Sequence, residues 1–253
     1  MMRMLNLIRS EFYRLIRSKP YYGLIIVSTF LVMAAAGVLQ HFRFKEPTFP
    51  YGTRMFYYSN VLGMPTLIII LCLLVILILT RKSKTKMCAA VSFGHSRQAV
   101  FWAKLITLSF GVIIMGTIIL SVTILSGNVI FDLANNSTLG QFLIAFSNIF
   151  PIVASSFILG YVLAVNGVSE ILNLLILLFI YRILGVSINT LVGRVSALKT
   201  ISKWTPATLF DNNLVHYMSN NVYFDVKCWV LGLMIIFISL IIGQTIFKKK
   251  DLA

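Results

Sequence analysis

Long runs of apolar residues separated by short polar stretches dominate the pattern along the chain. A helix needs about 20 mostly apolar residues to cross about 30 Å of hydrocarbon. Six runs have about this length, at residues 21–40, 62–80, 105–127, 141–165, 171–192 and 228–247. The alternating short strands of a membrane barrel are absent. The pattern therefore predicts an all-α integral membrane protein with six transmembrane helices.

Two of the six runs contain a residue that disturbs an apolar helix. Pro151 lies within the fourth run, where its missing backbone donor predicts a kink or a break. Arg182 lies within the fifth run, beside the polar side chains of Tyr181 and, further on, Asn189. Either the fifth helix is short or tilted and Arg182 reaches an interface, or Arg182 faces a polar cavity or a partner subunit on a substrate path.

The first 19 residues have the pattern of a helix that lies at a membrane surface. Apolar residues recur at helical spacing and basic residues occupy much of the remaining face, which suits the headgroup layer of anionic lipid. We expect an uncleaved interfacial helix over residues 1–19, ended by Pro20. The recurring apolar residues are Met1, Leu5, Ile8, Phe12, Leu15 and Ile16.

Composition supports the membrane assignment. Of the 253 residues, 58% are hydrophobic and 11% are charged, and the mean hydropathy is +0.91. Soluble domains carry about 25% charged residues, so a soluble domain and a disordered chain are both excluded. The formal charge of +15 would suit a nucleic-acid partner only if the basic residues shared one water-exposed face. They are instead divided among the segments between the runs, and we expect no nucleic-acid partner.

The distribution of Lys and Arg predicts the orientation. Five precede the first run, six lie between the second and third, and three follow the last, so 14 of the 22 lie on one side of a six-span protein. The other side holds seven, and Arg182 remains within the membrane. Because cytoplasmic segments are richer in Lys and Arg, we expect a multi-pass protein of the cell membrane with both termini in the cytoplasm.

Catalytic motifs are missing from the sequence. It contains no His-Glu-x-x-His pair, no Gly-x-Ser-x-Gly elbow and no phosphate-binding loop ending in Gly-Lys-Ser/Thr. The seven acidic residues are scattered, and Arg182 cannot release its proton at working pH. We therefore expect neither an enzyme nor an ATP-binding site, cofactor or metal on this chain.

Two further segments carry a recognisable pattern. Ser156, Gly160 and Ala164 recur every four residues in the fourth run, a small-residue ridge that allows close helix packing, either within the subunit or, less commonly, at a dimer seam. The outer segment 193–227 is long for a loop, and apolar residues every third position predict an interfacial helix that ends before Pro206. This helix is either an external gate or an anchor for the sixth span.

The segment between the second and third runs predicts two helices with a tight turn. Residues 84–91 suit a short crosswise helix, Gly94 a left-handed stop, and Ser96 the N-cap of a helix that continues from Arg97 through Lys104 into the third span. An alternative interpretation is that the basic residues of this loop only fix the topology.

The layout and this motif together resemble a known family. A basic amphipathic N-terminal helix, six spans, and Gly94-His95-Ser96-Arg97 followed seven residues later by Lys104 are similar to type-2 ABC exporter permeases. The resemblance points to the small Gram-positive branch that includes lantibiotic self-protection, bacitracin-resistance and phenol-soluble-modulin exporters. It covers the whole chain in layout and about twenty residues in motif.

The resemblance implies partners and roles. Residues 1–19 would be the elbow helix and residues 84–93 the coupling segment that docks on a separate ABC ATPase, which would bind ATP and Mg²⁺. A second copy of the permease, or a homologue, would complete the assembly. One departure is that family members carry an acidic residue early in the coupling segment, and this loop has none. The implied docking residues are Lys86, Met87, Val91, Phe93 and Arg97.

The resulting hypothesis is a permease domain over residues 20–253 that serves an ATP-driven exporter. Its substrate would be an amphipathic or hydrophobic molecule, such as a peptide toxin, bacteriocin or antibiotic, and this substrate class follows from the resemblance alone. Two alternatives are a secondary transporter without an ATPase and a non-transporting immunity or sensor-partner protein in the membrane.

Overall fold

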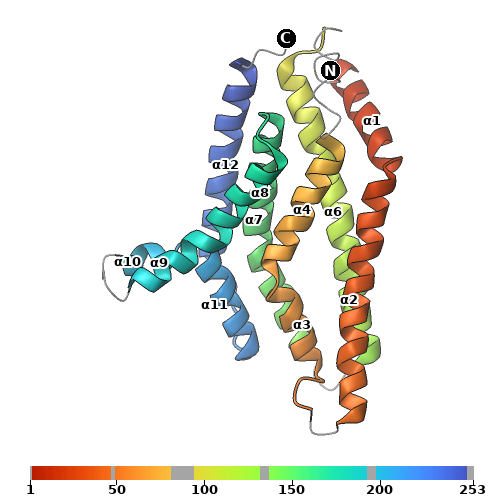
Figure 1. Cartoon of the computed structure of the whole chain (residues 1–253), viewed down its shortest axis with the longest axis vertical. Coiled ribbons are helices and arrows are strands. Elements are labelled where there is room, and N and C mark those ends of the chain that lie inside the picture. Colours follow the sequence, from red (N-terminus) through yellow and green to blue (C-terminus); the bar gives the residue numbers. More distant parts are fainter. Residues whose placement is uncertain (1, 47–48, 81–93, 132–136, 193–197, 250–253) are drawn as a thin grey trace.

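The computed structural model of the chain describes residues 2–46, 49–80, 94–131, 137–192 and 198–249. These residues form helices joined by short turns, with no strand among them (Figure 1). The elements are α1 (Met2–Ile16), α2 (Lys19–Lys45), α3 (Arg54–Leu62), α4 (Pro65–Thr80), α6 (Arg97–Ile130), α7 (Ser137–Val165), α8 (Glu170–Leu178), the π-helix η1 (Phe179–Ile183), α9 (Leu184–Val192), α10 (Leu198–Ser202), α11 (Pro206–Met218) and α12 (Val226–Lys249).

Five of the described helical segments are long and apolar enough to cross a membrane. They are α2, α6, α7, the continuous segment α8–η1–α9, and α12, and they correspond to five of the six expected spans. The chain is therefore an all-helical, multi-pass membrane protein.

The second expected span differs from the prediction. Most of the expected range 62–80 is helix α4, which begins at Pro65. It is preceded by α3, and the two helices are bent by 53° relative to each other at the break formed by Gly63 and Met64. The 16 residues of α4 correspond to about 24 Å, which is short of the hydrocarbon thickness. If α3 and α4 count as one broken span, the number of spans is six.

The N-terminal helix packs along the third span. Helix α1 ends at Ile16, and Pro20 lies in the first turn of α2, so this proline begins the next helix rather than ending α1. Leu15 is buried against Gly111 of α6, and the Phe12 and Phe110 rings lie 5.4 Å apart. Figure 1 shows α1 and α2 descending along one side of the bundle. The interfacial position of α1 stays a prediction.

Helix α7 lies at the centre of the bundle and packs against α4, α11 and α12. Half of its most apolar window is buried, against 28% or less in the other candidate spans. The helix continues through Pro151, so the break that the sequence allowed is not found. The two largest apolar clusters both include residues of α7, and they share the partly buried Val153.

Helix α12 approaches α7 closely because it presents glycines to it. A methyl group placed on Gly232 would lie 2.5 Å from the carbonyl carbon and oxygen of Pro151, and one placed on Gly243 would overlap the Val162 side chain. Cys228 and Ser239 are buried on the same helix. Small residues at a helix seam let the two backbones approach, which increases van der Waals contact in a lipid environment.

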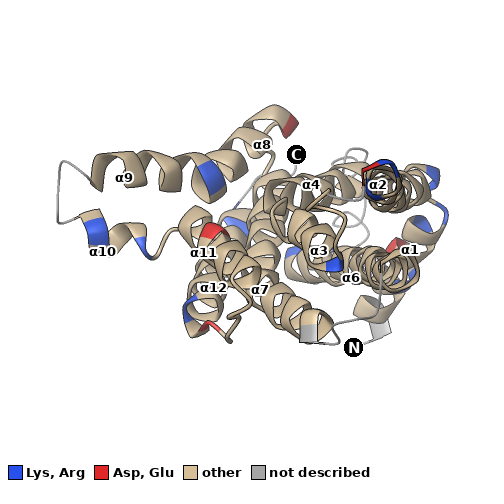
Figure 2. Cartoon of the chain, turned by 90° about the horizontal axis from the view of Figure 1, so that it is seen from below, with Lys and Arg blue, Asp and Glu red and all other residues tan. Residues whose placement is uncertain are grey.

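The fifth span and the segment after it form an arm on one side of the bundle. Helices α8 and α9 extend outward, and α10 lies at the end of this arm (Figure 2). The segment 193–227 was expected to hold one helix before Pro206. Helix α10 covers part of this range, but the longer helix is α11, which begins at Pro206 and packs back against α7 and η1. The proline thus starts the main helix of the segment.

The seam between α7 and α12 predicts the effect of adding one methyl group. Gly232→Ala should destabilise the protein by about 1–3 kcal/mol, because the methyl group meets backbone atoms of Pro151 that cannot rotate away. Gly116→Ala on α6 is the matched control, since no atom lies within 4 Å of that position. The control should be neutral or gain up to about 1 kcal/mol from helix propensity. Thermal unfolding in detergent measures both, and equal midpoints would contradict the assigned seam.

Candidate functional site

Several polar side chains lie at the contact between the fifth span and α11. The π-helix η1 interrupts the fifth span, and the Leu184 N–H donates to the carbonyl of Phe179, five residues earlier. Such a wide turn re-aims its side chains and often marks a functional site. Tyr181 on this turn is buried, and its hydroxyl shares a hydrogen bond of 2.7 Å with the Ser155 hydroxyl of α7.

Arg182 on the same turn forms an ion pair with α11. Its Nη1 donates to Asp211 Oδ1 at 2.9 Å. The side chains of Arg182 and Asp211 are 44% and 52% exposed, respectively, so this pair lies on the outside of the single chain. The sequence left open an interfacial position for Arg182 and a contact with a cavity or a partner subunit. Neither interpretation named Asp211 as its partner.

Asn189, the third polar residue expected within the fifth span, also contacts α11. Its side-chain nitrogen donates to the Thr208 hydroxyl at 3.0 Å, and Thr208 shares a hydrogen bond of 2.8 Å with Thr205. The two helices meet closely because Gly185 has no side chain; a methyl group there would lie 2.7 Å from Ala207 Cβ. Thr205, Thr208 and Asp211 recur every third residue, so one face of α11 carries the polar contacts to the fifth span.

The opposite side of α11 is fixed to α7 by amide groups. Asn148 donates to Asn213 Oδ1 at 3.1 Å, and Asn213 donates to the Ala145 carbonyl at 2.9 Å. Asn148 also donates to the Tyr223 carbonyl at 2.9 Å and accepts from the Asp225 backbone N–H at 3.0 Å. Helix α11 is therefore held between α7 and the fifth span by hydrogen bonds on both sides.

The surroundings of the Arg182–Asp211 pair are apolar and exposed. Phe179 and Ile183 on the fifth span, and Val215 on α11, are each about half exposed or more. An open apolar groove runs along the same helix and is lined by Leu175, Ile176, Phe179, Ile180 and Ile183. A charged side chain that faces lipid near a helix centre costs about 2.5–3.5 kcal/mol on insertion scales. Contact with lipid alone would thus leave this ion pair in an energetically unfavourable environment.

The small-residue ridge of α7 lies against neighbouring helices of the same chain. Ser156 is buried, and a methyl group at Gly160 would lie 3.2 Å from Leu177 of α8 and 3.4 Å from Ile76 of α4. The Gly160 carbonyl accepts a hydrogen bond of 2.9 Å from Asn173 of α8. Ala164 packs at the edge of the same apolar cluster. The ridge is therefore occupied by contacts within the subunit.

The expected ATPase-docking residues are only partly described. The segment 84–93, with Lys86, Met87, Val91 and Phe93, lies outside the described residues. The turn after it has the predicted geometry: Gly94 has a φ of +81°, and the Ser96 hydroxyl accepts from the Ala99 N–H at 3.2 Å as the N-cap of α6. Arg97 Nη1 donates to the Lys248 carbonyl at 2.9 Å, which ties the start of α6 to the end of α12.

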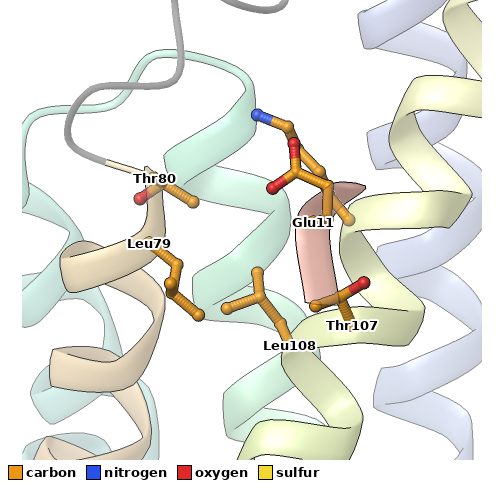
Figure 3. Close-up of a pocket in the computed structure, with 6 residues that line it drawn as sticks. Glu11, Leu79, Thr80, Thr107 and Leu108 are labelled. Atoms are coloured by element: carbon orange, nitrogen blue, oxygen red, sulfur yellow. The ribbon is translucent and has the colours of Figure 1, made fainter. Parts of the chain in front are cut away.

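A second polar cluster joins α1 to the two helices that flank this loop. Arg14 forms an ion pair of 2.7 Å with Glu11 and donates to the Leu79 carbonyl near the end of α4 at 3.3 Å. Figure 3 shows Glu11 beside Leu79 and Thr80 of α4 and Thr107 and Leu108 of α6. Together with the buried Lys104 of α6, these residues line a space of about 10 Å³, near the lower limit for one water molecule. Helix α1 thus contacts both α4 and α6, the two helices that precede and follow the loop.

The described residues contain no group of three His, Cys, Asp or Glu side chains placed to hold a metal ion. The residues that sequence reasoning missed are Asp211, Asn148 and Asn213, together with the glycines of α12. A weak signal existed for Asp211, since it follows Thr205 and Thr208 at a spacing of three on a helix that begins with proline. The amide pair is separated by 65 residues and left no local pattern.

Comparison with known proteins does not identify the chain. No model of a known protein family matches it, and no curated protein matches it at a significant level. The resemblance to ABC exporter permeases therefore remains a hypothesis carried by the layout and the Gly94–Lys104 motif.

The Arg182–Asp211 pair predicts a coupling between two substitutions. Arg182→Gln and Asp211→Asn should each lower the thermal midpoint in lipid nanodiscs, because each leaves one charge unpaired on an apolar surface. The double variant should recover much of the loss, which gives a coupling energy of about 1 kcal/mol or more, above the 0.2–1 kcal/mol typical of exposed pairs in water.

Lys203→Gln is the control for loss of a charge, because Lys203 is exposed on the segment between α10 and α11. It should leave the midpoint within error and show no coupling to Asp211→Asn. Strictly additive effects of Arg182→Gln and Asp211→Asn would show that the pair does not form in the membrane.

Proposed function

We propose that this chain is the permease subunit of an ATP-driven exporter, with six spans, both termini in the cytoplasm, and ATP hydrolysis on a separate ABC ATPase. A second permease copy or a homologue completes the assembly. The exported molecule is amphipathic or hydrophobic, most consistent with a peptide such as a toxin, bacteriocin or antibiotic.

The observation that carries the proposal of transport is the half-exposed Arg182–Asp211 pair on an apolar surface. A protein that worked alone in lipid would gain by burying this pair or by replacing it with apolar residues. A water-filled path or a partner subunit removes that cost, and both are features of a transporter assembly. Charged residues that face a cavity within the membrane commonly mark the path of a substrate.

The six-span topology is supported by the arrangement of the chain ends. Both termini lie at the upper end of the bundle in Figure 1, and α6 begins at this end as well. With α3 and α4 as one broken span, the six crossings return the C-terminus to the side of the N-terminus. The positive-inside rule then places this end, with 14 of the 22 Lys and Arg, in the cytoplasm.

The way the loop is anchored supports docking of an ATPase there. The Glu11–Arg14 cluster fixes the end of α4 to α1, and Arg97 fixes the start of α6 to the end of α12. A force applied to residues 81–96 therefore reaches α1, α4, α6 and α12 together. Because packed helices move as rigid bodies, this linkage suits a machine in which ATP-driven closure of the partner repositions several spans at once.

The proposal predicts that an ATPase subunit co-purifies with the tagged chain from detergent extracts. Met87→Asp combined with Phe93→Asp should lower the amount of bound ATPase at least about tenfold, because two charges replace apolar contacts at the centre of the interface. Membrane insertion should not change. The ratio of ATPase to tagged chain, measured by quantitative mass spectrometry, gives the result.

Phe44→Asp combined with Tyr51→Asp is the matched control, since both residues are exposed at the opposite end of the bundle. It should retain the ATPase. If no ATPase follows the wild-type chain, and no ATPase changes its hydrolysis rate in its presence, the ABC proposal fails. A secondary transporter or a non-transporting membrane module would then be the alternative. Normal association in the Met87/Phe93 double variant would overturn the assignment of the coupling segment.

A further inference from the structure

A second charged residue, Arg54, lies in the outer half of the bundle and is not explained by the proposed export function. It is the first residue of α3, after the N-cap Thr53, at the end of the bundle opposite the two termini (Figure 1). Only 6% of Arg54 is exposed. A buried arginine is rare unless it is paired, because its charge cannot be removed by deprotonation.

The guanidinium of Arg54 has neutral partners on two of its three nitrogens. Its Nε donates to the Tyr58 hydroxyl at 3.3 Å, and its Nη2 donates to Asn128 Oδ1 of α6. The guanidinium carbon, Cζ, lies 5.6 Å from the centre of the Tyr58 ring, within range of a cation–π contact. Its Nη1 is buried and has no hydrogen-bond partner among the described residues. No carboxylate of the described residues forms an ion pair with Arg54.

A second buried donor without an acceptor belongs to the same aromatic cluster. The hydroxyl of Tyr217 on α11 is buried and has no hydrogen-bond partner in the part of the chain that the structure describes. The Phe142 ring lies 4.4 Å from the ring of Tyr58 and 6.5 Å from that of Tyr217, so these three side chains form one aromatic cluster, which Arg54 contacts through Tyr58. Burial and the neighbouring Tyr58 raise the pKa of Tyr217, against the opposing effect of Arg54, so its hydroxyl remains a proton donor.

The surroundings add further positive potential. Arg43, Lys45 and Glu46 lie at the end of α2 and together carry a net charge of +1, and the Arg43 side chain lies against Gly52 in the segment before α3. Arg54 itself lies at the N-terminal end of α3, where the unpaired backbone N–H groups and the helix dipole favour an anion. Two buried donors without an acceptor among the described residues, one of them permanently charged, thus belong to the same part of the bundle, where Arg54 is close enough to oppose the rise in the pKa of Tyr217. What both donors lack is an acceptor, and the missing charge is negative.

We propose that Arg54 and Tyr217 bind an oxyanion, a carboxylate or a phosphate group, between α3 and α11. Such a group accepts hydrogen bonds from the Arg54 Nη1 and the Tyr217 hydroxyl and neutralises the buried charge. It comes either from a soluble molecule, including an exported one, or from a lipid headgroup. The site does not depend on whether the chain is an exporter, so it stands or fails separately from the proposed function.

Access to the site requires α3 and α11 to separate. Neither the Arg54 Nη1 nor the Tyr217 hydroxyl is reached by solvent in the arrangement described here. Gly127 shows how tight the cluster is, since a methyl group there would lie 2.6 Å from the Tyr58 hydroxyl. Binding therefore selects an arrangement in which α3 and α11 lie further apart, and the anion stabilises that arrangement.

The test is the thermal midpoint of the full-length protein in lipid-free detergent, followed by tryptophan fluorescence. Sodium acetate and inorganic phosphate are titrated against sodium chloride at equal ionic strength. Wild type should gain on the order of 5–10 °C at a hundredfold excess over Kd, with saturation. Nanodiscs of phosphatidylglycerol and of phosphatidylcholine form the second arm. A gain seen only with phosphatidylglycerol assigns the site to a lipid headgroup.

Three variants make the test specific. Arg54→Gln should abolish the gain, and Tyr217→Phe, which removes only one buried hydroxyl, should weaken binding at least about threefold while leaving the midpoint without anion unchanged or higher. Lys45→Gln removes an exposed charge from the same end and should bind as wild type. Because Tyr217→Phe keeps the packing, the result does not depend on Arg54→Gln folding normally.

Three outcomes would overturn the proposal. One is a gain of equal size in wild type and Arg54→Gln, which would indicate a general salt effect. Another is no saturable gain with acetate, phosphate or either lipid. The third concerns Asp132, which follows Asn128 by four residues and lies outside the described residues. If only Asp132→Asn makes the protein respond to acetate, the chain's own carboxylate serves Arg54.

Discussion

The close approach of α12 to α7 is the contact on which the other helices depend. It requires glycine at positions 232 and 243, because Pro151 and Val162 of α7 occupy the space that side chains there would need. In lipid there is little hydrophobic gain from joining two helices, so such contact must come from surfaces that fit. With one side of α7 fixed in this way, its remaining faces receive α4, α8 and α11.

The second constraint is that polar groups within an apolar solvent must find partners inside the protein. Tyr181 meets Ser155, Asn173 meets the Gly160 carbonyl, and Asn148 meets Asn213, so each of these buried contacts also fixes a helix to α7. Two charged sites are less well provided for. Arg182 and Asp211 pair with each other but are half exposed, and the buried Arg54 guanidinium has one nitrogen without a partner among the described residues. At these two sites a partner subunit or a ligand would supply contacts that the chain itself does not provide.

Helix α11 contributes a residue to both sites, the Arg182–Asp211 pair and the surroundings of Arg54. One of its faces carries Asp211, which pairs with Arg182 of the fifth span. Near its C-terminal end, Tyr217 packs against Phe142 in the aromatic cluster that includes Tyr58, the partner of Arg54. A displacement of α11 would therefore change the exposed ion pair and the buried arginine together. The opposite end of the bundle is organised differently. There α1 is bonded to the end of α4, and the start of α6 is bonded to the end of α12, on either side of the loop that follows α4. Contacts beside the loop thus tie several helices together at one end of the bundle, whereas α11 takes part in both charged sites.

The sequence by itself determined the all-helical class, five of the spans, the turn at Gly94 and the N-cap at Ser96, because helix length, apolar run length and capping are local properties. Only the tertiary structure decided the break at Gly63 and Met64, the role of Pro206 as the start of α11, and the partners of Arg182, Tyr181 and Asn189. The contacts of Arg182, Tyr181 and Asn189 join residues that are 19–29 positions apart in the sequence. Asn148 and Asn213 are 65 positions apart. Hydropathy records how apolar a residue's neighbours along the chain are, whereas pairing depends on which helices lie side by side.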